Sequence, residues 1–292
     1  MPTIVMTGGT SGIGAVALRR LAAEGRVLLG ARGPGPGAAE TLPLDLARLD
    51  DVRAFAGAVA GRLAGEEIDA LVLNAGLIPP RGGRTADGFE TAFGVNHLAH
   101  YLLARLLLPH LAAGATVVLT TSGTHDPAER TVQPAPRHAD ARRLAHPELD
   151  PERGRTPWTA AGRAYSSSKL CNLLTVRALA ARPGLDATVL AYDPGPVPAT
   201  GLVRHYPRAV RAGWRVLARP LSALGPSPNS VAAAGDALAD LALGRARPPA
   251  GRYYAALRDN ELVWKQPSEL ARRDDLRDAL WRDSAELAGL DA

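Results

Sequence analysis

The chain has 292 residues, of which 46% are hydrophobic and 22% are charged. This length and apolar content suffice for one large core, and nothing marks a linker, so we expect a single domain over residues 1–292. The formal net charge is +5, but the arginines are spread along the chain and aromatic residues make up only 4%. That pattern is not typical of nucleic-acid binding, which uses basic patches and stacking surfaces.

The cysteine count and the N-terminus indicate the compartment. Cys171 is the only cysteine in the sequence, so no intrachain disulfide can form, as is usual in a reducing cytoplasm. The first predicted strand begins at Thr3, which leaves no room for a signal peptide, and no run of about 18 apolar residues occurs. We expect a cytoplasmic protein. His97 and His100 lack partners at metal-ligand spacing, so no metal is expected.

The N-terminal segment combines a short apolar strand, a glycine-rich turn and a helix. Residues 3–14 read TIVMTGGTSGIG, and a helix-forming stretch over 15–24 follows and ends at Gly25. In such a unit, glycines let the backbone approach a pyrophosphate, which amides at the positive end of the helix bind. The predicted binding residues are Thr7, Gly8, Thr10, Ser11, Gly12, Ile13 and Gly14. A tight turn that binds no ligand is the alternative.

A second strand is predicted over residues 26–31 and is followed by Arg32. At this strand end, an acidic residue binds the ribose 2′-hydroxyl of NAD, whereas a basic residue accommodates the 2′-phosphate of NADP. Arg32 therefore predicts NADP(H) as the cofactor. In this arginine-rich chain, Arg32 could instead be a solvated turn residue.

Two further strands, over 41–44 and 69–73, lead into polar or small residues. Parallel strands present their carboxyl ends at the sheet edge where ligands bind. We therefore expect the adenine and its ribose to be bound there. The predicted contacts are Asp45, Leu46, Asn74, Ala75 and Gly76.

A tyrosine and a lysine are spaced for one helix face. Lys169 is one of two lysines among 34 Lys and Arg residues, and it lies four positions after Tyr165. A compact ammonium can stabilise a phenolate, whereas arginine is a wide planar fork. A surface pair that shares a helix face is the alternative. A fifth strand over 117–121 places Ser122 at its carboxyl end.

These motifs occur in one order that resembles the short-chain dehydrogenase/reductase family. They are TGxxxGxG at Thr7, Asn74-Ala75-Gly76, Ser122, the Tyr165–Lys169 pair and Pro194-Gly195. Within the family, three stretches resemble the branch of protochlorophyllide reductases and retinol dehydrogenases. These stretches are 96–100, 165–175, and 194–202, which ends in Thr200-Gly201-Leu202.

The resemblance implies an α/β fold with a single-domain, Rossmann-type, doubly wound parallel sheet flanked by helices. It also implies a catalytic set. Ser122 would bond the substrate carbonyl and Tyr165 would donate the proton. Lys169 would lower the pKa of Tyr165 and hold the nicotinamide ribose, so both residues would also contact the cofactor. Asn96 would hold a water that links Lys169 to bulk solvent.

The loop after the sixth strand resembles the family's nicotinamide-binding loop. The implied contacts are Pro194, Gly195, Val197 and Thr200. Two departures occur: Pro196 stands where protochlorophyllide reductases typically have a cysteine, and Ala199 where a threonine is common. The first weakens the case for light-driven reduction of a chlorophyll precursor and favours carbonyl reduction.

Two segments are expected to determine the substrate. The segment at about 125–163 is rich in Pro, Arg, Ala and Asp, and we expect a partly ordered flap, with disorder as the alternative. In it, His125 could reach the substrate or be solvated. A lid is expected at about 201–228, where apolar residues recur at helical spacing beside arginines. It would cover a bulky hydrophobic substrate; plain packing or docking on a membrane surface are alternatives.

The leading interpretation is an NADPH-dependent ketoreductase that interconverts a bulky hydrophobic ketone or aldehyde and its alcohol. We expect it to be bacterial, with natural-product metabolism as one setting, and to be a monomer or homodimer. A carbon-carbon double-bond reductase of the protochlorophyllide type is one alternative. A non-catalytic NADP-binding sensor with a protein partner is the other.

Overall fold

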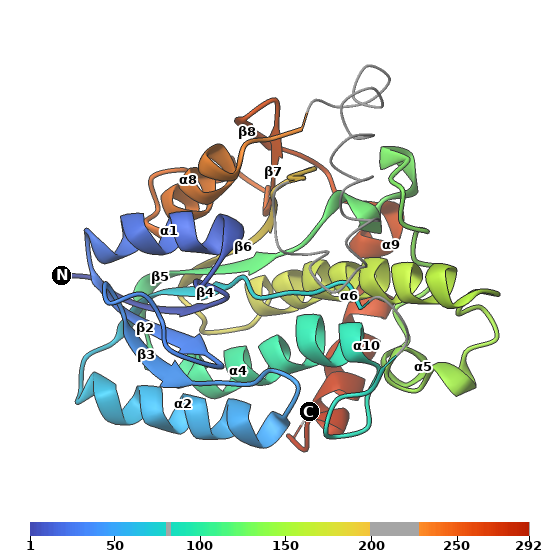
Figure 1. The fold of residues 1–292 in the computed structure, drawn as a ribbon, viewed down its shortest axis with the longest axis horizontal. Helices are drawn as coiled ribbons and strands as arrows, with labels where there is room; N and C mark the ends of the chain where they lie inside the picture. The colour runs from blue at the N-terminus through green and yellow to red at the C-terminus, as the bar shows by residue number, and fades with distance from the viewer. Residues whose placement is uncertain (80–82, 199–227, 292) are drawn as a thin grey trace.

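In the computed structural model, which describes residues 1–79, 83–198 and 228–291, the strands form one eight-stranded sheet in the order β3-β2-β1-β4-β5-β6-β7-β8 (Figure 1). β1 to β7 pair in parallel, and only β8 runs antiparallel, at the edge beyond β7. The predicted Rossmann-type sheet is therefore confirmed. The strands are β1 (Thr3–Thr7), β2 (Arg26–Ala31), β3 (Glu40–Pro43), β4 (Ile68–Leu73), β5 (Leu111–Thr120), β6 (Ala187–Asp193), β7 (Tyr254–Arg258) and β8 (Glu261–Trp264).

Helices cover both faces of the sheet (Figure 1). One face carries α1 (Gly12–Ala22) and α8 (Val231–Ala242), packed over one apolar core. The other carries the long helices over a second core: α2 (Leu49–Leu63), α4 (Ala99–Leu107), α6 (Pro157–Ala180) and α10 (Asp274–Leu287). Shorter helices are α3 (Thr91–Phe93), α5 (Ala141–Ala145), α9 (Glu269–Arg272), the π-helix η1 (Gly94–Leu98), and the 3₁₀ turns η2 (Leu108–His110), η3 (Gly123–His125), η4 (Pro127–Glu129) and η5 (Pro147–Leu149).

The two-sided cover explains the strand sequences. All five residues of β1 are buried, as expected for a central parallel strand whose side chains face helices on both sides. On the α1 face, a Cβ at Gly235 would lie 2.4 Å from the Cβ of Val16. Glycine at this position therefore lets α8 pack directly on α1.

The element boundaries differ little from those expected. β2 matches the predicted range 26–31, β4 begins one residue earlier at Ile68, and β3 is shifted by one residue to Glu40–Pro43. β5 is longer than predicted and ends at Thr120, so Ser122 lies just beyond the strand. The connection from β2 to β3 contains no helix, which agrees with its content of Pro and Gly.

The segment expected to be a flap, about 125–163, contains η4, α5, η5 and the first turns of α6. Three exposed large apolar residues lie in it: Val132, Leu149 and Trp158. The segment expected to be a lid, about 201–228, lies outside the described residues except for its last position. No helix of the described residues combines the length and apolar content needed to cross a membrane.

Candidate active site

The glycine-rich turn after β1 is packed tightly against the loop after β4. Gly8 and Gly12 have φ angles of +71° and +56°, a left-handed conformation that favours glycine. A Cβ at Gly8 would lie 2.6 Å from the Cα of Ala75, and one at Gly14 would lie 1.9 Å from the carbonyl oxygen of Gly8. Only glycine fits at these two positions. The two segments expected to bind a dinucleotide are therefore in direct contact.

Hydrogen bonds hold this junction together. Thr7 Oγ1 accepts from the backbone N–H groups of Asn74 and Ala75, both at 3.1 Å. The Asn74 amide donates to the carbonyl oxygen of Gly8 at 3.1 Å and accepts from Thr120 Oγ1 at 3.0 Å. The ends of β1, β4 and β5 are thereby joined through side chains.

The N-terminus of α1 has the character of an anion site. Ser11 is the N-cap residue but makes no side-chain capping bond, and the first turn carries no acidic residue. Uncapped amides and the helix dipole favour a negative group, so these residues fit the pyrophosphate of a dinucleotide. Thr10 and Ser11 are exposed, whereas Ile13 is half-buried.

The residues expected near the adenosine end follow β2 and β3. Arg32 comes directly after β2 and is exposed, so its guanidinium is accessible to a ligand. Asp45 is half-buried and accepts a hydrogen bond from the backbone N–H of Ala47 at 3.1 Å. Leu46 is buried. Because these positions follow parallel strands, they lie at the same sheet edge as the glycine-rich turn.

Ser122, Tyr165 and Lys169 meet where the middle of α6 passes the end of β5. The two α6 side chains are buried, at 5% exposed for Tyr165 and 3% for Lys169. Lys169 Nζ lies 5.8 Å from the centre of the Tyr165 ring and donates to the carbonyl oxygen of Thr120 at 3.0 Å. The Ser122 side chain is close enough to Tyr165 to act on the pKa of its phenol. The predicted catalytic side chains are thus brought together.

Burial dominates the acid-base properties of this group. It raises the pKa of Tyr165 to about 12, although the nearby Ser122 hydroxyl acts in the opposite direction. It lowers the pKa of Lys169 to about 8, because a buried ammonium loses its hydration. The net shift of the Tyr165 pKa is therefore upward, whereas a lowering by Lys169 was expected from the sequence. Tyr165 is a neutral phenol here and can donate a proton.

Asn96 lies in the π-helix η1 and is fully buried. Its side chain accepts from the N–H of Leu77 at 2.9 Å, and donates to the Leu77 carbonyl at 3.0 Å and to Ser168 Oγ at 3.1 Å. It therefore attaches the loop after β4 to α6. A Cβ at Gly76 would lie 3.4 Å from Lys169 Nζ, so this loop also lines the lysine. Water binding by Asn96 stays a prediction.

His100 is a member of this network that the sequence did not indicate. Its Nδ1 lies 3.1 Å from the carbonyl oxygen of Asn96, and its Nε2 lies 2.9 Å from Thr7 Oγ1. Burial lowers the pKa of His100 to about 4, so the ring is neutral at neutral pH. Nδ1 then donates to Asn96, and Nε2 accepts from Thr7. The spacing of four residues from Asn96 on a helix was the available signal.

His125 neither projects into solvent nor lies in an open loop, which corrects the sequence-based expectation. It is fully buried, and its ring packs edge-on against Tyr254 with 5.3 Å between the ring centres. Its Nδ1 lies 2.7 Å from the carbonyl oxygen of Ser122, and its Nε2 accepts from the N–H of Ser268. His125 therefore connects the backbone of Ser122 to the backbone of Ser268.

The loop after β6 is held by the C-terminal part of the chain. Gly195 has a φ angle of +65°, and a Cβ there would lie 2.6 Å from the carbonyl oxygen of Leu257. Asn229 donates to the carbonyl oxygens of Pro194 and Leu257, both at 2.9 Å. Val197 is half-buried. Thr200, also expected to contact the nicotinamide, lies outside the described residues, as does Ala199.

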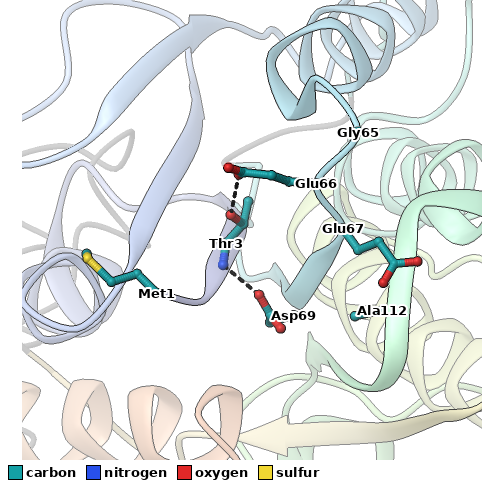
Figure 2. Close-up of a pocket in the computed structure, with 7 residues that line it drawn as sticks. All are labelled: Met1, Thr3, Gly65, Glu66, Glu67, Asp69 and Ala112. Atoms are coloured by element: carbon teal, nitrogen blue, oxygen red, sulfur yellow. Dashed lines mark hydrogen bonds between the residues drawn. The ribbon is translucent and has the colours of Figure 1, made fainter.

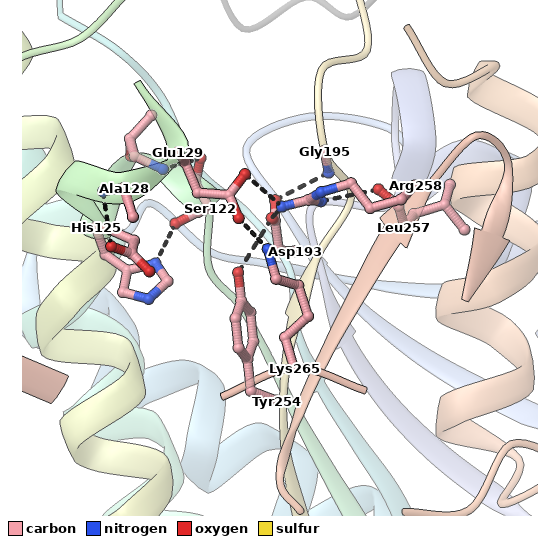
Figure 3. Close-up of polar contacts among 12 residues, drawn as sticks. Ser122, His125, Ala128, Glu129, Asp193, Gly195, Tyr254, Leu257, Arg258 and Lys265 are labelled. Atoms are coloured by element: carbon pink, nitrogen blue, oxygen red, sulfur yellow. Dashed lines mark hydrogen bonds and ion pairs between the residues drawn. The ribbon is translucent and has the colours of Figure 1, made fainter. Parts of the chain in front are cut away.

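An ion network that the sequence did not indicate lies beside this loop (Figure 3). Asp193, at the end of β6, pairs with Arg258 of β7 at 3.0 Å. Arg258 also pairs with Glu129 at 3.1 Å, and Glu129 pairs with Lys265. These residues are far apart in the sequence and each is ordinary alone, so only the fold brings them together.

A hollow at the opposite edge of the sheet is unconnected with this chemistry. It is lined by Met1, Thr3, Gly65, Glu66, Glu67, Asp69 and Ala112 (Figure 2). The N–H of Thr3 donates to Asp69 at 2.7 Å, and its hydroxyl donates to Glu66 at 3.3 Å. These acids therefore pair with the start of β1, whereas the catalytic group lies beyond the strand ends. In the described ranges, no group of His, Cys, Asp or Glu could hold a metal ion.

A parallel sheet with an anion site after β1 and a Ser-Tyr-Lys group at the same edge defines an oxidoreductase that uses a nicotinamide cofactor. Residues 2–132 match the family model described as short chain dehydrogenase. Dehydrogenase/reductase SDR family member 13 of Bos taurus is 35% identical over 308 residues, covering 99% of this chain and 73% of that protein.

Two further relatives belong to the branch expected from the sequence. Protochlorophyllide reductase A, chloroplastic, of Oryza sativa subsp. japonica is 31% identical over 319 residues, covering 98% of this chain and 80% of that protein. Retinol dehydrogenase 12 of Homo sapiens is 33% identical over 307 residues, covering 98% of this chain and 86% of that protein. The chain belongs to the short-chain dehydrogenase/reductase family, whose members act on carbonyl or alcohol groups.

Proposed function

We propose that this protein is an NADPH-dependent reductase of bulky apolar ketones or aldehydes, and that it oxidises the corresponding alcohols in reverse. The observation that carries the proposal is that the half-buried Ser122 lies close to Tyr165 and Lys169, both of which are buried. A neutral phenol close to a serine hydroxyl is suited to protonating a developing alkoxide.

The cofactor would lie along the carboxyl edge of the sheet. The turn from Thr7 to Gly14 and the N-terminus of α1 would hold the pyrophosphate. Arg32 would bind a 2′-phosphate, because its exposed guanidinium follows β2, where the adenosine ribose lies in this fold. A reduced nicotinamide held by these residues would provide the hydride that carbonyl reduction needs.

The protein's own residues would manage the proton and the geometry. Ser122 would orient the carbonyl oxygen, and Tyr165 would give that oxygen its proton. Lys169 keeps a buried positive charge near the phenol, which favours the phenolate left after transfer. Its low pKa of about 8 means that it can also pass a proton near neutral pH.

Preference for a bulky apolar substrate is supported by the relatives and by the segment at 125–163. One relative is a retinol dehydrogenase and another a protochlorophyllide reductase, and both named substrates are large and largely apolar. Val132, Leu149 and Trp158 expose apolar surface on this segment. Such surface is suited to lining an apolar substrate cleft.

The deciding assay follows NADPH consumption with a panel of polycyclic, polyketide-like and retinoid carbonyls. We expect turnover of at least one bulky carbonyl, appearance of the alcohol, and a loss of at least about 100-fold in kcat for Tyr165→Phe. Full activity in Tyr165→Phe would remove this residue as the acid. NADPH binding without turnover of any compound would favour the sensor alternative.

Reduction of a carbon-carbon double bond is the second candidate, favoured by the relative named protochlorophyllide reductase. Pro196 argues against it, because a cysteine is typical at this position of those enzymes. The two reactions have different products: double-bond reduction removes the conjugated absorption without forming an alcohol. A cytoplasmic location and a monomeric or homodimeric state are further predictions.

A further inference from the structure

Asp193 is buried where three segments meet that are far apart in the sequence (Figure 3). Its Oδ1 accepts from the N–H of Gly195 at 2.9 Å. Its Oδ2 accepts from the Tyr254 hydroxyl at 3.2 Å and from Arg258 Nη2 at 3.0 Å. Asp193 is 1% exposed, so these three donors replace the hydration that a carboxylate loses on burial.

The ion network joins the C-terminal hairpin to the turn after Ser122. Arg258 Nη2 also donates to Glu129 Oε2 at 3.1 Å, and Glu129 pairs with Lys265 beyond β8. Glu129 ends the 3₁₀ turn η4, which follows η3 and the serine. A movement of Arg258 would therefore displace both the turn after Ser122 and the end of β6.

Two glycines show how close the ion pair lies to the predicted substrate and nicotinamide positions. A Cβ at Gly123, the residue after Ser122, would lie 3.2 Å from Asp193 Oδ2 and 3.4 Å from Arg258 Nη2. A Cβ at Gly195 would lie 3.3 Å from Arg258 Nη1. The pair thus packs against the backbone of both segments.

Asp193 also acts through space on the two α6 residues. Burial is the main cause of their shifts, raising the pKa of Tyr165 to about 12 and lowering that of Lys169 to about 8. The negative charge of Asp193 raises the pKa of both. The guanidinium of Arg258 opposes that charge, because opposite charges in contact cancel much of each other's field.

We propose that Asp193 and Arg258 are positioning residues that hold the Ser122 turn and the Gly195 loop together and set the pH range in which Tyr165 transfers its proton. The inference rests on the proposed reductase function for its chemistry. The contacts themselves do not depend on that function.

Tyr165 and Lys169 have shifted pKa values in the alkaline range, about 12 and about 8. Within the described residues, the other titratable or charged groups that surround Asp193 and these two residues are His100, His125, Glu129, Tyr192, Tyr254, Arg258 and Lys265. Burial lowers the pKa of His125 and raises that of Tyr254 well above its usual value. The Glu129 pKa is lowered because its cationic partners outweigh burial.

The test compares Asp193→Asn with Arg258→Gln in the pH profile of alcohol oxidation, which needs the phenolate form. Without Arg258, the charge of Asp193 is uncompensated, so we expect the profile midpoint to rise by at least about 0.5 pH unit. Without the Asp193 carboxylate, Arg258 and Lys265 share the single charge of Glu129, so the cluster becomes more positive and the midpoint should fall by a similar amount. The double variant should return toward the wild-type midpoint.

A second readout does not need a substrate. An ultraviolet difference titration of the NADP⁺ complex, with Tyr165→Phe subtracted, follows ionisation of Tyr165 alone. We expect the ionisation midpoint of Tyr165 to rise in Arg258→Gln and to fall in Asp193→Asn, as in the pH profile. If no alcohol is oxidised but the titration shifts, the proposed function fails and this inference stands.

Two controls separate charge from loss of structure. Arg258→Lys keeps the charge and should keep the wild-type midpoint. Arg177 is as buried as Arg258, with 16% against 17% of its side chain exposed, and pairs with Asp274. It lies twelve residues beyond Tyr165 on α6, about 18 Å along the axis, so Arg177→Gln should not shift the midpoint. Folded variants with unshifted midpoints, or shifts of one sign in both, would overturn the inference.

Discussion

Lys169 donates a hydrogen bond to the carbonyl oxygen of Thr120 at 3.0 Å while its Nζ lies 5.8 Å from the centre of the Tyr165 ring. The ammonium is therefore anchored to the end of β5 and acts on the phenol through space. The same carbonyl accepts from the Asn172 amide at 3.0 Å. The position of the charge thus depends on the strand as much as on the helix that carries it.

Replacing Lys169 tests whether its compact charge is needed. We expect Lys169→Met to lose at least about 100-fold in kcat, because no charge then favours the phenolate. Lys169→Arg should recover little of this loss, since a wide guanidinium does not fit a buried site shaped for an ammonium. Kinetics with circular dichroism as the folding check measure this. Near wild-type activity in Lys169→Met would contradict the assigned role.

Arg32→Asp tests the cofactor preference. The ratio of kcat/KM for NADPH to that for NADH should fall by at least about 10-fold, because a carboxylate repels the 2′-phosphate and accepts from a 2′-hydroxyl. Arg32 is exposed, so the free energy of unfolding should change by less than about 0.5 kcal/mol. Arg19, an exposed arginine of α1, provides the control as Arg19→Asp. An unchanged ratio would show that Arg32 does not touch the phosphate.

Gly14→Ala tests the close packing of the glycine-rich turn. Its Cβ would lie 1.9 Å from the carbonyl oxygen of Gly8, so we expect destabilisation by about 1 to 3 kcal/mol and weaker cofactor binding. Gly57 lies in α2 with no atom within 4 Å of an added Cβ. Gly57→Ala should instead stabilise the protein by up to about 1 kcal/mol. Urea unfolding and cofactor titration compare the two; equal effects would contradict the packing argument.

Acid should destabilise the protein through its buried histidines. Burial lowers the pKa of His97 to about 3 and that of His100 to about 4, from an ordinary 6.5. Between pH 6.5 and 4 the unfolded chain binds more protons at these rings, so stability falls as the pH falls, by up to about 1.4 kcal/mol per pH unit for each.

Glu90 opposes this trend and provides the test. Burial raises its pKa to about 7 from 4.5, so its contribution to stability is complete below pH 4.5 and is lost as the pH rises to 7. Glu90→Gln removes this contribution. Urea unfolding at several pH values should show a steeper loss of stability with acid in this variant than in the wild type. A shallower loss would show that Glu90 is not held neutral.

Much of the architecture follows from local sequence signals. The apolar runs that became β1, β2 and β4, and the glycines that follow β1, depend on near neighbours in the chain and on the periodicity of strands and helices. The spacing of Tyr165 and Lys169 on one helix is equally local. For this reason, the fold class and the meeting of these two side chains could be predicted from the sequence.

The tertiary structure decided the environment of these side chains. The raised pKa of Tyr165 follows from its burial, which no spacing of residues reports. Asp193 and Arg258 are 65 positions apart, and His125 meets Ser268 across 143. Such contacts exist only after strands from distant parts of the chain pair side by side. Because electrostatic interactions depend on distance and solvation rather than on sequence order, the sequence specifies the reacting groups, while the folded chain sets their proton affinities.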